Sequence, residues 1–304
     1  MRKLKDNYLL IIVFTLLLIV LGANYFSYLK KVENWQDSDR EIREECLQHQ
    51  ENNSYSSTEH QKFCQELSTK TFNKPDFFTI FTEVIVYNFN KIGVIIPLLI
   101  MIPTIWYVTR YLRSKMVINE LTRESYHKIL KKLALYAYKS SLILPLIIVV
   151  GSILIILYTK DFNFDYAILN SSTGWSQDVM SRPILFLVLY ILNVLFHCVI
   201  YINIALIVIR KNHNFFIAAF LSFLTYIGIE LFQEVFMENI LLYIVFKSNI
   251  GVVFNILNIF SFNDSYGLLI IIFSSFIMML ISFLIVCLAY KNKEKIVIDC
   301  ERNE

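Results

Sequence analysis

RYLRSKMVINELTRESYHKILKKLALYAYK, residues 110–139, lies between two long apolar runs and carries a dense positive charge. It holds eight Lys or Arg residues against Glu120 and Glu124, which gives a net charge of +6. Short loops rich in Lys and Arg stay on the cytoplasmic side of a membrane. This segment is therefore expected to be cytoplasmic, and it orients the apolar runs on either side.

The composition of the chain is typical of a membrane protein rather than of a soluble domain. Its 304 residues are 56% hydrophobic and only 17% charged, whereas roughly a quarter of the residues in a soluble domain are charged. The formal net charge of +3 is too small to indicate a nucleic-acid partner, and the basic residues lie beside apolar runs, where they set orientation. We expect an all-α polytopic protein of the cell membrane.

Six apolar runs approach the length of about 20 residues that a helix needs to cross a bilayer. They cover residues 8–28, 92–108, 140–158, 183–209, a run that begins at 215, and 267–290. The first run follows Arg2, Lys3 and Lys5 and is long for a signal peptide, so we expect an uncleaved first membrane helix. Basic residues at both ends of the chain place both termini in the cytoplasm.

This topology divides the chain into consecutive parts. Polar residues interrupt residues 77–90, which favours an interfacial helix, and they also break residues 240–262, which favours a re-entrant hairpin. The expected parts are residues 1–29 (cytoplasmic lead and first membrane helix), 30–76 (external loop domain), 77–109 (interfacial helix and second membrane helix), 110–139 (basic cytoplasmic segment), 140–290 (membrane helices three to six, with the hairpin near 240–262) and 291–304 (cytoplasmic tail).

Residues 30–76 are polar, with a net charge of −3, and are expected to form a small helical domain outside the membrane, between the first and second membrane helices. Within them, the spacing of Cys46, His49, His60 and Cys64 resembles that of a zinc site. The two cysteines also suit a disulfide that closes a short loop, and free thiols are a third interpretation. We take Cys46 and Cys64 as a disulfide candidate and expect no bound metal.

Two groups of polar residues recur every four positions within the apolar runs. Asn193, His197 and Tyr201 share one helix face, as do Glu230 and Glu234 with Glu238. Polar groups at membrane depth usually face other helices or an aqueous cavity, so these residues are candidates for a substrate path, although hydrogen bonding between packed helices also explains the first group. An enzyme using Glu230, Glu234 and His197 is a weak alternative, because no nucleophilic motif accompanies them.

The second half of the basic segment has a helical pattern of its own. Tyr126, Ile129, Leu130, Leu133 and Ala137 fall on one face, and three lysines fall on another. This pattern predicts an amphipathic helix at the inner membrane surface. Two interpretations remain open: an anchor that rests on anionic membrane lipid, and a docking element for a cytoplasmic partner.

The layout of the chain resembles the permease subunits of bacterial type-2 ABC transporters, which also have a basic connector between the second and third membrane helices. The run NELTRESYHKIL, residues 119–130, is similar to that connector, in which a Thr-Arg pair precedes a helix. The resemblance implies a coupling segment that contacts a separate ATPase subunit, and a second permease copy. The coupling residues it implies are Arg123, Glu124, Tyr126, His127, Lys128 and Leu130.

The resemblance also implies an ATP-driven exporter that moves a peptide, a lipid or a hydrophobic small molecule by alternating access. The sequence contains no G-x-x-x-x-G-K-[ST] loop, so ATP and Mg are expected in the partner ATPase, with no cofactor bound directly and no enzymatic activity in this chain. The alternative from another class is a non-transporting membrane sensor or immunity protein that binds a ligand through its external domain.

Overall fold

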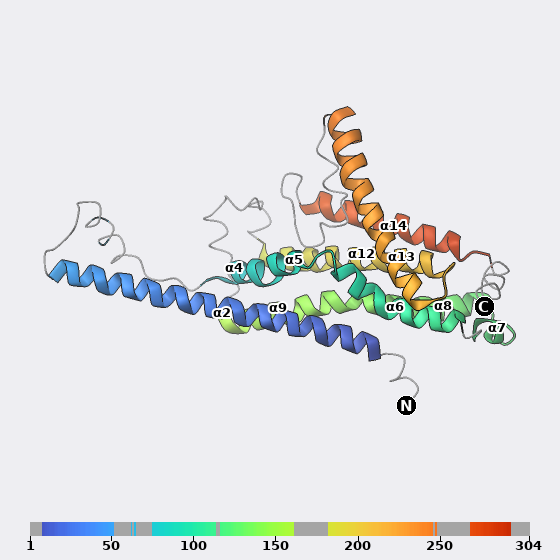
Figure 1. Ribbon diagram of the computed structural model, residues 1–304, viewed down its shortest axis with the longest axis horizontal. Helices are drawn as coiled ribbons and strands as arrows, with labels where there is room; N and C mark the ends of the chain where they lie inside the picture. Colours follow the sequence, from blue (N-terminus) through green and yellow to red (C-terminus); the bar gives the residue numbers. More distant parts are fainter. Residues whose placement is uncertain are drawn as a thin grey trace.

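The regular structure of the chain is helical. The computed structural model describes residues 8–51, 62, 64, 75–113, 116–160, 182–245, 247 and 268–292, and these residues contain no β-strand. Figure 1 shows the helices in chain order. They are α2 (Tyr8–Glu51), α4 (Phe77–Phe81), η1 (Thr82–Tyr87), α5 (Asn88–Lys91), α6 (Ile96–Arg113), α7 (Met116–Leu121), α8 (Tyr126–Ala137), η2 (Tyr138–Leu142), α9 (Ile143–Thr159), α12 (Pro183–Ile209), α13 (Phe215–Leu231), η4 (Phe232–Val245) and α14 (Leu268–Ala289).

Five helical stretches in the described part of the chain are long and apolar enough to cross a membrane: Tyr8–His49, Tyr126–Thr159, Ile184–Ile209, Phe215–Phe236 and Leu269–Ala289. The prediction of an all-α, multi-pass membrane protein is confirmed at this level. The predicted count of six is not shown. The second predicted span corresponds to α6, which is not among the five and ends in Arg110 and Arg113.

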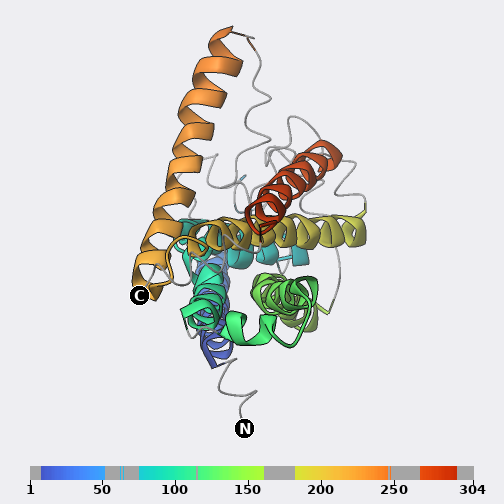
Figure 2. The same ribbon diagram turned by 90° about the vertical axis from the view of Figure 1, so that its right-hand side faces the viewer.

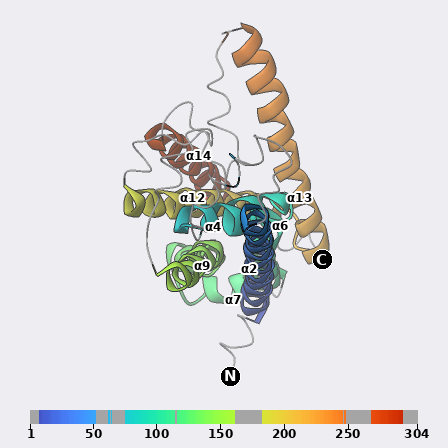
Figure 3. The same ribbon diagram turned by 90° about the vertical axis from the view of Figure 1, so that its left-hand side faces the viewer.

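The helix α12 is the centre of the packing. It lies against α6, α9, α13 and α14, and large side chains such as Tyr190 and Tyr201 are fully buried on it. Figure 2 and Figure 3 show the α9 region nearly end-on, with α12 crossing above it. The α13–η4 stretch leaves this arrangement at a steep angle, as all three views show.

A close approach joins α2, η1 and α9 on the other side of the molecule. A Cβ atom built on Gly151 of α9 would lie 3.1 Å from Ile85 Cδ1 and 3.2 Å from Leu21 Cδ1. Glycine therefore lets α9 pack closely against both neighbours. Further along, the rings of Tyr25 and Tyr158 meet edge to face at 6.2 Å between centroids.

The region predicted as an interfacial helix is a continuous helical stretch whose middle part is π-helical. α4, η1 and α5 follow one another from Phe77 to Lys91, and a turn at residues 92–95 separates them from α6. Asp76 caps α4, because its side chain accepts a hydrogen bond from the backbone N–H of Thr79 at 3.0 Å. Pro97 lies in the first turn of α6, where a missing N–H costs little, whereas Pro103 lies inside that helix.

The stretch that was predicted to form a small external domain begins as a continuation of α2. Residues 30–51 continue α2 as one helix of 44 residues that extends well past its contacts with α9 (Figure 1). The polar composition of this stretch is compatible with helix, so nothing in the local sequence ends α2 where the apolar run ends. Of the predicted re-entrant hairpin, residues 240–245 belong to η4, and the rest lies outside the described residues apart from Lys247.

Candidate functional site

The basic connector between α6 and α9 consists of two helices joined by a short turn. α7 ends at Leu121, where the Thr122 hydroxyl donates a hydrogen bond of 2.7 Å to the Asn119 carbonyl. Ser125 is the N-cap residue of α8, and its backbone is extended. α8 then passes through η2 directly into α9. The predicted segment 110–139 is therefore mostly helical in its described part.

The apolar face of α8 is covered by α6. Ile129, Leu133 and Ala137 are buried. Thr104 of α6 donates a hydrogen bond of 2.7 Å to the Ala137 carbonyl, and a Tyr107–Tyr136 stack joins the two helices at 4.5 Å between ring centroids. Part of the apolar face of α8 therefore packs against the protein itself.

The opposite face of α8 and the turn before it expose a group of basic residues. We call this group the basic face; its members are Arg123, His127, Lys128 and Lys131, all of them exposed. Leu135, at 66% exposure, continues this side of the helix with an apolar side chain. Three of the six predicted coupling residues, Arg123, His127 and Lys128, are therefore accessible to a partner.

Glu124 has a different role, because it fixes the turn to α8. Its carboxylate lies 2.7 Å from Lys132 Nζ, which also lies 3.9 Å from Glu120 Oε2. The hydrogen bond from Lys132 is the main cause that lowers the pKa of Glu124. The Tyr111 hydroxyl of α6 donates a hydrogen bond of 2.7 Å to Glu120 Oε2. This cluster connects α6, α7 and α8 through polar contacts.

Tyr126 and Leu130 point away from the basic face, toward α14. The Tyr126 hydroxyl donates a hydrogen bond to the Tyr290 carbonyl just after α14. The Tyr290 hydroxyl in turn donates a bond of 2.9 Å to the Leu206 carbonyl of α12, and the Arg210 guanidinium lies 6.0 Å from the Tyr290 ring centroid. Tyr126 therefore links the connector to the ends of two membrane helices.

A second polar link crosses the same helices. The Tyr138 hydroxyl of η2 donates a hydrogen bond to Asn203 Oδ1 of α12, and Asn203 Nδ2 donates a bond of 2.8 Å to Ser282 Oγ of α14. Sequence analysis missed Asn203, Ser282 and Tyr290. Asn203 is a polar residue inside an apolar run, a feature that marks buried contacts, but it falls outside the four-residue repeat of Asn193.

An apolar cavity of about 630 Å³ lies between α8 and the second half of α14. Leu206 of α12 lines the cavity, and so do the basic residues His127 and Lys291. The residues that line it are Tyr126, His127, Leu130, Leu133, Ala134, Tyr138, Leu206, Phe283, Leu284, Val286, Cys287, Leu288, Tyr290 and Lys291.

The predicted substrate-path residues of α12 are buried between packed helices. Asn193, His197 and Tyr201 are each at most 2% exposed. Asn193 Oδ1 accepts a hydrogen bond of 2.7 Å from Ser275 of α14, and His197 Nδ1 lies 2.9 Å from the Asn193 carbonyl. The Tyr201 ring meets that of Tyr226 edge to face at 5.4 Å. These contacts are typical of side chains between closely packed helices.

The two predicted glutamates occupy different environments. Glu230, near the end of α13, is buried, whereas Glu234 is exposed in η4. Glu230 belongs to α13, which packs against α6 and α12, whereas η4 follows where this stretch leaves the packed helices (Figure 1). The side chain of Glu238 lies outside the described residues. Glu230 and Glu234 therefore differ in their exposure to solvent, and their role in a substrate path stays a prediction.

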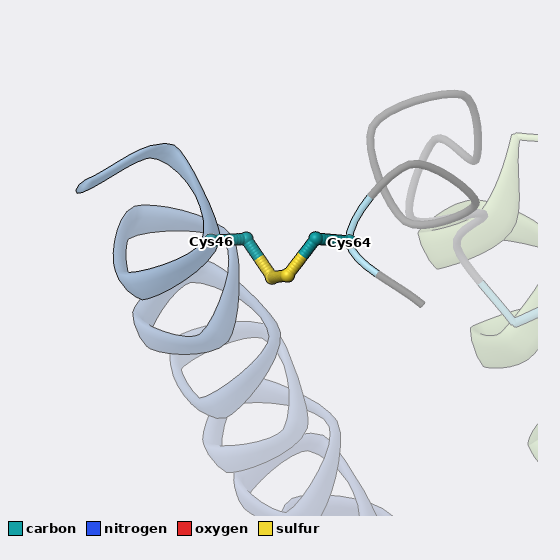
Figure 4. Close-up of a disulfide and its surroundings, with 2 residues drawn as sticks. All are labelled: Cys46 and Cys64. Atoms are coloured by element: carbon teal, nitrogen blue, oxygen red, sulfur yellow. A yellow bond between two sulfur atoms is a disulfide. The ribbon is translucent and has the colours of Figure 1, made fainter. Parts of the chain in front are cut away.

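Cys46 and Cys64 form a disulfide, with their Cα atoms 5.4 Å apart (Figure 4). The bond ties the end region of α2 to the chain 18 residues further on. The described residues contain no group of three or more His, Cys, Asp or Glu side chains that could hold a metal ion, and His60 of the zinc-like spacing lies outside them. The sulfur atoms of Cys46 and Cys64 are thus bonded to each other.

Comparisons with protein-family models, with curated proteins and with solved structures found no match for this chain. The connector and its contacts are therefore the features from which we infer function.

Proposed function

We propose that the chain is the membrane-spanning permease subunit of an ATP-driven ABC exporter of the type-2 class. In this proposal a peptide, a lipid or a hydrophobic small molecule crosses the membrane by alternating access. A cytoplasmic ATPase subunit binds ATP and Mg, hydrolyses the ATP and docks on the connector, and a second permease copy completes the cavity. The proposal counts α6 as the sixth membrane helix, with both termini in the cytoplasm.

The observation that carries the proposal is the basic face of the connector. Arg123, His127 and Lys128 are exposed on the connector, in the turn before α8 and in the first turn of that helix. The connector lies between two apolar stretches of the chain. It is bonded to α6, α12 and α14 through Thr104, Tyr138 and Tyr126. A force applied to the exposed face would therefore reach three membrane helices through direct contacts, as coupling requires.

The disulfide supports the proposed orientation. Disulfides persist in oxidising compartments and are rare in the cytoplasm. If Cys46 and Cys64 lie outside, the apolar first part of α2 crosses the membrane and the basic amino end lies inside, in agreement with the positive charge of the connector. A helix of 18 residues such as α6 is about 27 Å long, close to the thickness of the hydrocarbon core.

Purification from native membranes tests this proposal. The tagged chain is extracted in mild detergent, and co-purified proteins are identified by mass spectrometry. We expect an ATPase with the wild-type chain and its loss with Lys128→Glu combined with Arg123→Glu, because charge reversal at a docking face repels a complementary partner. Lys160→Glu, an exposed lysine after α9 at its other end, is the matched control. Absence of any ATPase from the wild-type sample would contradict the proposal.

A second candidate function is a non-transporting membrane sensor or immunity protein. The observation that favours it is the continuation of α2 beyond the bundle to a disulfide-closed end, a shape that suits ligand capture. Deleting residues 40–70 separates the two candidates. After this deletion, a sensor should lose its response entirely. An exporter subunit should retain its ATPase partner, and the basal ATP hydrolysis of that partner should still depend on the connector.

A further inference from the structure

The cavity between α8 and α14 combines an apolar interior with a basic edge. Leu130, Leu133 and Phe283 are among the side chains that form the interior. Its volume of about 630 Å³ falls inside the range of about 300–1,000 Å³ that is usual for small-molecule sites. An apolar cavity of this size takes a ligand that is itself largely apolar.

The edge of the cavity carries positive charge from two helices. His127 and Lys291 line it directly, and Lys131 follows His127 by one helical turn on the same side of α8. The guanidinium of Arg210 lies over the ring of Tyr290, which itself lines the cavity. The first turn of α8 also lies at this edge. The partial positive charge at the amino end of that helix therefore adds to the positive electrostatic potential of the cavity.

The apolar side of the cavity continues onto an exposed apolar surface of α14. Leu284 and Leu288 line the cavity and are still 60% and 70% exposed. α14 is one of the helices long and apolar enough to cross a membrane. The cavity is therefore bordered by exposed apolar side chains of a candidate membrane helix and by the basic side chains of His127 and Lys291.

We propose that this cavity binds an anionic phospholipid, with an acyl chain between α8 and α14 and the phosphate beside His127, Lys131 and Lys291. Both the chemistry and the position of the cavity suit an anionic phospholipid. Acyl chains fill apolar grooves that face the bilayer, and basic pockets at the ends of membrane helices bind phosphate headgroups. The bound lipid bridges the connector to the last membrane helix, next to the Tyr126–Tyr290 hydrogen bond. The site does not depend on the proposed ATPase partner.

Cys287 provides a direct readout of occupancy. Its thiol lines the cavity and is exposed, whereas Cys198 is buried and Cys46 and Cys64 are bonded to each other. With Cys300→Ser, a change outside the described residues, a neutral maleimide reagent reports on the cavity in the full-length chain. A phospholipid seated against α14 blocks the reagent.

The experiment places the Cys300→Ser chain in nanodiscs of phosphatidylcholine, with or without phosphatidylglycerol, and measures the maleimide reaction rate at Cys287. We expect labelling about ten-fold slower with phosphatidylglycerol, as for a lipid at about ten times its Kd. Lys131→Gln combined with Lys291→Gln should remove that difference. Lys132→Gln should keep it, since Lys132 is on the same helix but pairs with Glu124. Membrane surface charge acts equally on all three chains and is thereby controlled.

Three results would overturn the proposal. The first is equal labelling of the Cys300→Ser chain in the two lipid compositions. The second is an equal phosphatidylglycerol effect in the double Gln variant, which would assign the protection to surface charge alone. The third is loss of the protection when residues 293–304 are removed, which would show that the carboxyl-terminal tail covers the cavity. Retention of phosphatidylglycerol over phosphatidylcholine in native mass spectra of the truncated chain would support it.

Discussion

At the scale of single residues, two glycines in membrane helices have opposite surroundings. A Cβ on Gly151 would press within 3.1–3.3 Å of Ile85 and Leu21, whereas a Cβ on Gly228 meets nothing within 4 Å. Gly228→Ala should therefore stabilise the protein by about 0.5–1 kcal/mol through helix propensity. Gly151→Leu should destabilise it by about 1–3 kcal/mol through overpacking.

Thermal unfolding in detergent, followed by circular dichroism, measures both glycine changes in the same conditions. The expected order of Tm values is Gly228→Ala, then wild type, then Gly151→Leu. A Gly151→Leu chain as stable as the wild type would show that α9 does not pack against α2 and η1 as described.

Glu124 is the residue whose ionisation the structure links to the connector. Its pKa lies below the ordinary value of 4.5, because Lys132 donates a hydrogen bond to the carboxylate. A lowered folded-state pKa means that the stabilisation is complete above pH 4.5 and is lost as the pH falls through the lowered value. The pair is exposed, so the effect is small.

Hydrogen exchange of the first turn of α8 at pH 6 and pH 3, corrected for intrinsic rates, detects this ionisation. Protection should fall at the lower pH in the wild type and change less in Glu124→Gln, in which the pair is absent at both values. The same loss in both chains would assign the pH effect to other groups.

At the scale of helices, Tyr126 joins α8 to the end of α14 through one hydrogen bond. Tyr126→Phe should cost about 0.5–1.5 kcal/mol of stability, because it removes this bond and keeps the ring. Tyr136→Phe is a matched control on the same helix, since it retains the stack on Tyr107. Denaturant unfolding measures both variants. An equal cost for the two would contradict a specific role of Tyr126.

The sequence predicted helices better than it predicted their ends and partners. Apolar runs and helical spacing placed α9, α12 and α14 within a few residues, because hydrophobic length and period are local properties. The end of α2 at Glu51 was missed, since polar residues 30–51 are as compatible with helix as with a loop. The π-helix that begins at Phe232 was missed as well.

The sequence also predicted the helices of the connector better than it predicted their contacts. Its amphipathic pattern was visible in the sequence, but a pattern does not say what covers the apolar face, and α6 covers it. Arg123, His127 and Lys128 are accessible as coupling residues must be, whereas Tyr126 and Leu130 face α14. The cavity beside them involves residues about 150 positions apart, and no local signal in one sequence reveals such a contact.

At the scale of the whole molecule, the proposed topology places Lys128 inside and Lys160 outside the cell. In a chain whose free cysteines are replaced by Ala, Lys160→Cys should react with an impermeant maleimide in intact cells. Lys128→Cys should react only after permeabilisation. Lys128 lies in the first turn of the helical stretch Tyr126–Thr159 and Lys160 directly follows its end, so the pair of measurements also shows whether that stretch crosses the bilayer. The reverse pattern would invert the topology.

The central claim is that a separate ATPase docks on the basic face of the connector. A photo-crosslinking amino acid placed at Lys128 in native membranes, followed by mass spectrometry of the adducts, tests it most directly. We expect an adduct with an ATPase subunit at position 128 and none with that subunit at position 160. ATPase-free adducts at position 128, in a sample in which the crosslinker reacts, would contradict it.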